Sequence, residues 1–199
     1  MFPLSRGTFP GALLKVRVFE PRYVEMIELC VRREIGFGVV LIERGSEVGG
    51  GDTRFDVGVS VSMTQVALLG NGHLIVIARG NSRIRVDEWL EDAPYPQARV
   101  RYLPDLPYDG SGSRLHQRLQ HEFQRGLALF SEMGAETRNI DPLPADTLAA
   151  AYRAVDLLPV PDLDRQMILE SGDPTRRIEL AITALESVNE LVEARLGSG

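Results

Sequence analysis

The chain has 199 residues, of which 44% are hydrophobic and 25% are charged, a composition typical of a soluble globular protein with one domain or two small ones. Its formal net charge of -6 argues against nucleic acid or an anionic membrane as the main partner, because both bind positively charged surfaces. The single cysteine excludes an internal disulfide. There is no signal-peptide pattern and no apolar run long enough to cross a bilayer, so we expect a cytoplasmic protein.

The first half of the chain, residues 1–105, follows the two-residue period of β-strands. Runs rich in branched side chains predict strands at residues 12–19, 37–43, 56–69, 73–80, 82–90 and 97–103. Within the third run the apolar positions change parity between Met63 and Val66, which predicts a β-bulge near residues 64–65. The Gly-Asn-Gly sequence at 70–72 predicts a hairpin turn. Closely spaced short strands favour a small closed or nearly closed barrel over a parallel sheet.

Arginines cluster on the later strands, at Arg79, Arg83, Arg85, Arg99 and Arg101. Successive side chains of a strand point to opposite faces. The alternation therefore predicts that several of these arginines face solvent as an ordinary charged surface.

A break in the pattern at residues 104–112, with two prolines and two glycines, predicts a linker between a β-rich part, residues 1–105, and a helical part, residues 113–199. Beyond it, the first predicted helix has an apolar stripe of Leu115, Leu119, Phe123, Leu127 and Phe130. A second helix is predicted over 145–158, with Leu148, Tyr152 and Val155 on one face, and a short third from Pro161 and Asp162 to Gly172. The last begins at Pro174 with Asp173 as N-cap, and its stripe is Ile178, Ile182, Leu185, Val188 and Val192.

The stretch FEPRYVEM, residues 19–26, places an acid, a proline, a base and a tyrosine together. Proline suits the first turn of a helix, so the stretch predicts a strand-to-helix turn with a local ion pair between Glu20 and Arg22. Tyr23 then shares the buried helix face with Met26, Ile27 and Cys30. The alternative, Glu20 as a general base and Tyr23 as an acid, would need a second polar cluster that the sequence does not show.

These segments resemble the N-terminal domain of Lon proteases. The resemblance covers FPLSRGTFPGALLKVRVFEPRY, FGVVLIERGSEVGG, FDVG, RGNSRIRVDEWLEDAPYPQARV and ILESGDPTRRIELAITALESVNELV, at residues 2–23, 37–50, 55–58, 79–100 and 168–192. It implies an α+β fold, with a PUA-like β-rich pseudobarrel followed by a helical bundle. It also makes Phe19, Glu20, Pro21, Arg22 and Tyr23 a structural signature. In Lon proteases this unit precedes the ATPase and peptidase domains and takes part in substrate recognition and assembly.

The sequence favours a protein that is not an enzyme. It has no phosphate-binding G-x-x-x-x-G-K-[ST] motif, so we expect it to act without ATP. Its only lysine, Lys15, falls within a predicted strand, which argues against the serine–lysine dyad of Lon peptidases. Cys30 is expected to be a core thiol and Trp89 a barrel anchor rather than a ligand platform. Three scattered histidines, His73, His116 and His121, give no framework for zinc, so neither metal nor cofactor is expected.

The best candidate for a binding element is the glycine-rich loop 43–55, with Glu47, Asp52, Arg54 and Phe55 as the candidate peptide-binding residues; an ordinary surface loop is the competing interpretation. We expect a non-catalytic module that binds unfolded polypeptide or a specific protein partner, by strand addition to an open barrel edge. It would act as an adaptor or substrate-recognition factor for a protease or ATPase supplied in trans. The alternatives are a PUA-like binder of RNA or of a small ligand, and a hydrolase that uses Tyr23 or Cys30.

Overall fold

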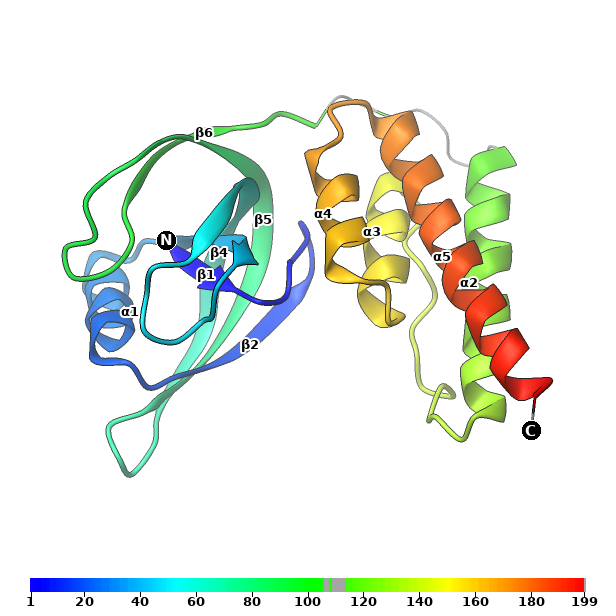
Figure 1. Ribbon diagram of the computed structural model, residues 1–199, viewed down its shortest axis with the longest axis horizontal. Helices are drawn as coiled ribbons and strands as arrows, with labels where there is room; N and C mark the ends of the chain where they lie inside the picture. Colours follow the sequence, from blue (N-terminus) through cyan, green and yellow to red (C-terminus); the bar gives the residue numbers. More distant parts are fainter. Residues whose placement is uncertain (106–107, 109–113, 199) are drawn as a thin grey trace. The chain divides into compact units, whose positions relative to one another are not determined.

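The computed structural model describes residues 1–105, 108 and 114–198 (Figure 1). They form two compact units, Met1–Pro104 and Asp105–Gly199. Residues 106–107 and 109–112 of the predicted linker lie outside the described residues, so its role as a hinge stays a prediction.

The first unit is a curled mixed sheet with one helix. Its elements are β1 (Phe2–Leu4), β2 (Leu13–Val18), α1 (Pro21–Arg33), β3 (Phe37–Arg44), β4 (Thr53–Leu68), β5 (Leu74–Trp89) and β6 (Ala98–Tyr102). The strand order is β1-β3-β4-β5-β2, and β6 also pairs with β5. The pair β1–β3 is parallel and the other pairs are antiparallel. The β-rich half of the predicted α+β fold is thereby confirmed.

The predicted bulge in β4 is present. Met63 pairs with Ala78 and Gln65 pairs with Ile77, which leaves Thr64 as the extra residue. The Thr64 hydroxyl donates a hydrogen bond to the Ile77 carbonyl at 3.1 Å. The bulge therefore changes which residues of β4 share a face, as the parity of its apolar positions predicted.

The prediction of separate strands at 73–80 and 82–90 was wrong, because β5 runs unbroken from Leu74 to Trp89. Gly80, which looked like a strand end, lies inside it and lets another segment approach. A Cβ atom there would lie 2.1 Å from the Phe9 carbonyl oxygen. The parallel strand β1 was missed because its three residues are too few for an alternation to show.

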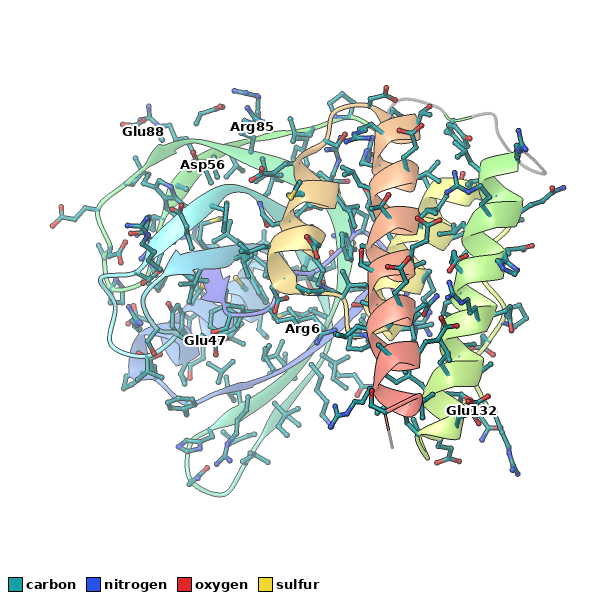
Figure 2. The ribbon with its side chains drawn as sticks, turned by 45° about the vertical axis from the view of Figure 1, so that its right-hand side comes forward. Arg6, Glu47, Asp56, Arg85, Glu88 and Glu132 are labelled. Atoms are coloured by element: carbon teal, nitrogen blue, oxygen red, sulfur yellow. The ribbon has the colours of Figure 1, made fainter. Side chains whose placement is uncertain are left out.

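The cluster of arginines is only partly a solvated surface. Arg99 and Arg101 are exposed and pair with Glu88 and Asp87, and Arg85 is exposed and projects outward from β5 (Figure 2). Arg83 is only 2% exposed, contrary to the expectation of a solvent-facing position. Alternation assigns a residue to a face of the sheet, but burial also depends on whether other segments cover that face.

The second unit is helical, with α2 (Arg114–Glu132), α3 (Thr147–Leu157), α4 (Asp162–Glu170) and α5 (Pro174–Leu196). The Asp173 carboxylate accepts a hydrogen bond from the Thr175 amide at 2.9 Å, which confirms the predicted N-cap of α5. The predicted apolar stripe of α5 is buried along its whole length. No helix among the described residues combines the length and the apolar character needed to span a membrane.

The buried face of α2 differs from the predicted stripe. Leu119 and Phe123 are buried as predicted, but Leu115, Leu127 and Phe130 are only half-buried. His116, Glu122, Gly126 and Leu129 complete the buried face. The difference arises because polar side chains find partners inside the bundle. The Asn189 amide of α5 donates to the Glu122 carbonyl oxygen and carboxylate at 2.9 and 3.0 Å.

Candidate functional site

The glycine-rich loop between β3 and β4 is held by polar contacts at several points. The Glu47 carboxylate, labelled in Figure 2, accepts a hydrogen bond from the Ser5 amide at 2.5 Å. The Gly49 amide donates to the Glu20 carboxylate at 3.5 Å. The loop is therefore tied both to the segment after β1 and to the start of α1.

Asp52 and Arg54 belong to a cluster of charged and aromatic side chains, of which the sequence predicted only these two as site residues. Their side chains are 2% and 10% exposed and form an ion pair of 2.5 Å. Arg54 also pairs with Asp92 at 3.3 Å and lies over the Trp89 ring, 4.9 Å from its centroid. Burial alone would raise the pKa of Asp52, but the hydrogen bond and charge of Arg54 outweigh it and lower that pKa. Half-buried Phe55 follows in β4.

In this arrangement the charges of Asp52 and Arg54 interact mainly with other residues of the chain. Trp89 and Asp92 were not predicted as their partners, because they lie more than thirty residues further along the sequence. Whether the loop binds peptide stays a prediction.

The FEPRY stretch makes the contacts of a structural turn. Pro21 begins α1, and Arg22 pairs with Glu20 at 3.0 Å and lies over the Tyr23 ring at 4.5 Å. Tyr23 is buried and meets Phe2 edge-on, with ring centroids 4.6 Å apart. Burial raises the pKa of Tyr23 to about 12, so its hydroxyl stays protonated at neutral pH. The cluster anchors α1 and, through Glu20, the glycine-rich loop.

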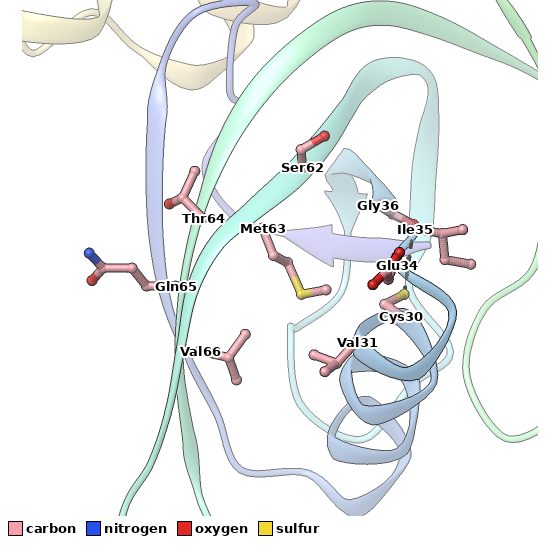
Figure 3. Close-up of a pocket in the computed structure, with 10 residues that line it drawn as sticks. All are labelled: Cys30, Val31, Glu34, Ile35, Gly36, Ser62, Met63, Thr64, Gln65 and Val66. Atoms are coloured by element: carbon pink, nitrogen blue, oxygen red, sulfur yellow. Dashed lines mark hydrogen bonds between the residues drawn. The ribbon is translucent and has the colours of Figure 1, made fainter.

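A groove lies between the C-terminal end of α1 and the middle of β4 (Figure 3). Its volume is about 440 Å³, and its lining residues are Cys30, Val31, Glu34, Ile35, Gly36, Ser62, Met63, Thr64, Gln65 and Val66. Figure 3 shows the side chains of Val31, Met63 and Val66 pointing into the same space, while Thr64 and Gln65 point away from it. Residues 63 and 66 of a regular strand would face opposite sides of the sheet, so the bulge at Thr64 gives the groove this wall.

The floor of the groove contains a cysteine with no sign of nucleophilic activation. The Cys30 thiol is buried and donates to the Gly36 carbonyl oxygen at 3.7 Å. Burial raises its pKa, which keeps the thiol protonated at neutral pH. Gly36 is required by close packing, since a Cβ atom there would lie 2.0 Å from the Val61 carbonyl oxygen.

A second hollow of about 400 Å³ continues the groove. The two share Ile35, Gly36 and Ser62. The second hollow extends to β6, where Val100 and Tyr102 line it, and to Met1. The two hollows therefore adjoin one another within the first unit. In the described part of the chain, no three histidine, cysteine, aspartate or glutamate side chains are placed to hold a metal ion.

Residues 1–187 match the family described as the ATP-dependent protease La (LON) substrate-binding domain. The chain belongs to this family. It is 25% identical over 203 residues to the Lon protease of Anaeromyxobacter dehalogenans, a match that covers 97% of the chain and 23% of that protease. The chain thus spans about a quarter of the length of this Lon protease.

A LON peptidase N-terminal domain and RING finger protein of Schizosaccharomyces pombe is 21% identical, with 98% of this chain and 46% of that protein covered. The crystal structure of a Lon N-terminal domain protein from Xanthomonas campestris superimposes with a TM-score of 0.69 at 26% identity, and 92% of this chain and 95% of that chain are covered. The family and the α+β fold implied by the resemblance are therefore confirmed.

Proposed function

We propose that this chain is a non-catalytic module that binds extended polypeptide segments in the groove between α1 and β4. The observation that supports the proposal is the set of apolar side chains left open along this groove. Val31, Ile35 and Val66 are 50%, 49% and 39% exposed although they lie beside one another on a folded unit. Clustered exposed apolar side chains mark interaction sites, because covering them removes apolar surface from water.

The shape of the groove favours a chain segment over a compact ligand. Its two hollows together run from Val66 to Tyr102. Two adjoining hollows with apolar side chains in their walls can hold several side chains of an extended peptide in succession. A small ligand would fill only one part of it and leave the remaining apolar surface exposed.

The charges near the groove argue against the RNA-binding alternative. Among the described residues that line either hollow, none is an arginine or a lysine. The exposed arginines of β6 pair with acidic residues of β5. RNA binding requires a positive surface along the phosphate backbone.

An adaptor role, in which the module presents a bound polypeptide to a protease or ATPase in trans, is part of the same proposal. In the Schizosaccharomyces pombe relative, a LON peptidase N-terminal domain is named together with a RING finger. That pairing supports a recognition role for such a domain outside the Lon proteases.

The test is fluorescence anisotropy of this protein with a labelled client, a small disulfide-bonded protein used in two forms: folded, and held unfolded by reduction and alkylation of the client's disulfides. We expect the unfolded form to bind preferentially and the binding to persist at high salt, because apolar contacts are little screened. Val66→Arg should weaken the binding at least tenfold. Leu191→Arg, at a position of α5 that is 73% exposed, is the matched control and should leave it unchanged. Equal binding of both forms, or no binding, would refute the proposal, and salt-sensitive binding of RNA would favour the alternative.

A further inference from the structure

The strand β4 is longer than its neighbour β3, and this leaves part of one edge unpaired. The pairing of β3 with β4 reaches Phe37 opposite Val61 and ends there. On its other side β4 stays paired with β5 as far as Leu68 opposite Leu74. Between Ser62 and Leu68, no strand in the described ranges pairs with β4 on the β3 side.

An open edge of this kind presents backbone N–H and C=O groups that another extended chain can pair with. Seven residues, Ser62 to Leu68, cover about 23 Å at roughly 3.3 Å per residue. That length accommodates a segment of about seven residues.

The groove lies directly along this edge. The side chains of Met63 and Val66 extend from it, and Val31 faces them from α1 (Figure 3). In an added strand, alternate side chains would project to the α1 side of the sheet. Apolar side chains at those positions would contact Val31, Met63 and Val66.

Glu34 stands at one end of this groove in a strained backbone conformation. It is the C-cap of α1, with φ of 52° and ψ of 39° in the left-handed region, where glycine is the usual residue. The helix ends there with the Ile35 amide bonded to the Cys30 carbonyl oxygen at 3.0 Å. A side chain is therefore present at a position where glycine would form the same cap with less strain. Among the described residues that line this hollow, Glu34 is the one with a charged side chain.

We propose that a segment of a client polypeptide pairs with the Ser62–Leu68 edge of β4 as an added strand, with branched apolar side chains toward α1 and a lysine or arginine at Glu34. The inference rests on the proposed function and specifies how the same groove recognises its ligand. The backbone pairing is independent of sequence, whereas the apolar wall and Glu34 select among segments.

The charge distribution favours a client over a second copy of this chain at the same edge. Two copies paired edge to edge would bring together two acidic grooves of chains that each have a net charge of -6. A client segment with a basic side chain instead complements Glu34.

The first arm of the test varies the peptide and leaves the protein unchanged, so protein folding does not affect its result. The parent is a labelled seven-residue peptide, Thr-Val-Thr-Val-Thr-Lys-Thr, in which a lysine near one end shares the face of the two valines. Two derivatives have N-methyl groups on alternate amides, one on each alternate set. In a paired strand, only one of these sets points toward β4. We expect one derivative to bind at least about tenfold more weakly and the other to bind within about threefold of the parent.

The second arm tests the side chains. A peptide with glutamate in place of the lysine should bind more weakly to the native protein. The variants E34Q and E34G should weaken binding of the lysine peptide by up to about fivefold. They should also reduce the difference in affinity between the lysine peptide and the glutamate peptide. E34Q removes the charge but keeps the strained backbone, whereas E34G removes both, so equal effects of the two variants would assign the loss of binding to the charge.

The outcomes distinguish this inference from the proposed function. If the unfolded client protein binds but both N-methylated peptides bind as well as the parent peptide, strand addition is overturned and the proposed function stands. If Glu34 variants leave the preference for lysine intact, the assignment of Glu34 is overturned. If neither the unfolded client protein nor any of the peptides binds, both the inference and the proposed function fail.

Discussion

Asn189 offers a sharp test of the polar network inside the helical unit. Its side chain is fully buried in α5, and its amide donates to the Glu122 backbone oxygen at 2.9 Å and to the Glu122 carboxylate at 3.0 Å. Both partners are acceptors, so the amide nitrogen must face them. Asn189→Ala should lower the free energy of unfolding by about 3 kcal/mol, because a hydrogen bond to a charged group is lost and a cavity remains.

Asn189→Asp keeps the shape but replaces the donor with a carboxyl group beside Glu122. To avoid two adjacent charges the new carboxyl must stay protonated in the folded state, which raises its folded pKa above the unfolded value of about 3.9. For such an acid the destabilisation grows as pH rises above the unfolded pKa. At about 1.4 kcal/mol per pH unit, Asn189→Asp should lower the free energy of unfolding by about 4 kcal/mol at pH 7 and by about 1.5 kcal/mol at pH 5.

The two variants should therefore exchange rank between pH 7 and pH 5, with Asn189→Asp the less stable at pH 7 and the more stable at pH 5. Urea unfolding followed by far-ultraviolet circular dichroism measures this. Glu190→Gln, at the adjacent exposed position, is the control and should stay within about 0.5 kcal/mol of the native protein. If the two variants keep the same order at both pH values, the network around Glu122 does not stabilise the unit as described.

Three further predictions concern the β-rich unit. Asp52→Asn should lower the free energy of unfolding at pH 7 by about 2 kcal/mol, because it breaks a nearly buried ion pair with Arg54. Since the pKa of Asp52 is lowered in the folded state, the stability that the ion pair contributes is present above the unfolded pKa and is lost as pH falls through the folded pKa. Asp87, which forms an exposed ion pair with Arg101, is the control. An equal loss of stability for Asp87→Asn would contradict the prediction. Glu34→Gly should raise the melting temperature by removing about 1 kcal/mol of backbone strain, and an unchanged or lower value would refute the left-handed cap. Cys30 should react with a thiol reagent at least tenfold more slowly in the native protein than in urea, because it is buried with a raised pKa; equal rates would show an accessible thiol.

The features that the sequence predicted correctly depend on signals within a few residues. Asp173 followed by Pro174 marks the start of α5, and the parity change between Met63 and Val66 marks the bulge in β4. Local capping and strand geometry decide both, so neighbouring residues suffice to recognise them.

The groove could not be predicted in the same way. Its walls combine Val31 from the end of α1 with Val66 from β4, and only the pairing of β3 with β4 brings these segments together. The partners of Arg54 were missed for the same reason, since Asp92 and Trp89 reach it through the fold. The burial of Arg83 likewise depends on which segments cover its face of the sheet. Loop composition directed attention to residues 43–55, whereas the exposed apolar side chains of the groove, Val31, Ile35 and Val66, belong to other segments.

The unpaired edge of β4 has a consequence for handling the protein in solution. A row of open backbone groups can also pair with a second copy of the chain, and the acidic character of the chain opposes that contact by mutual repulsion. Added salt screens the repulsion but leaves the backbone pairing and the apolar contacts intact. Concentrated preparations should therefore remain monodisperse at low ionic strength and self-associate as ionic strength rises, whereas dilute protein keeps the edge open for its ligand at high salt.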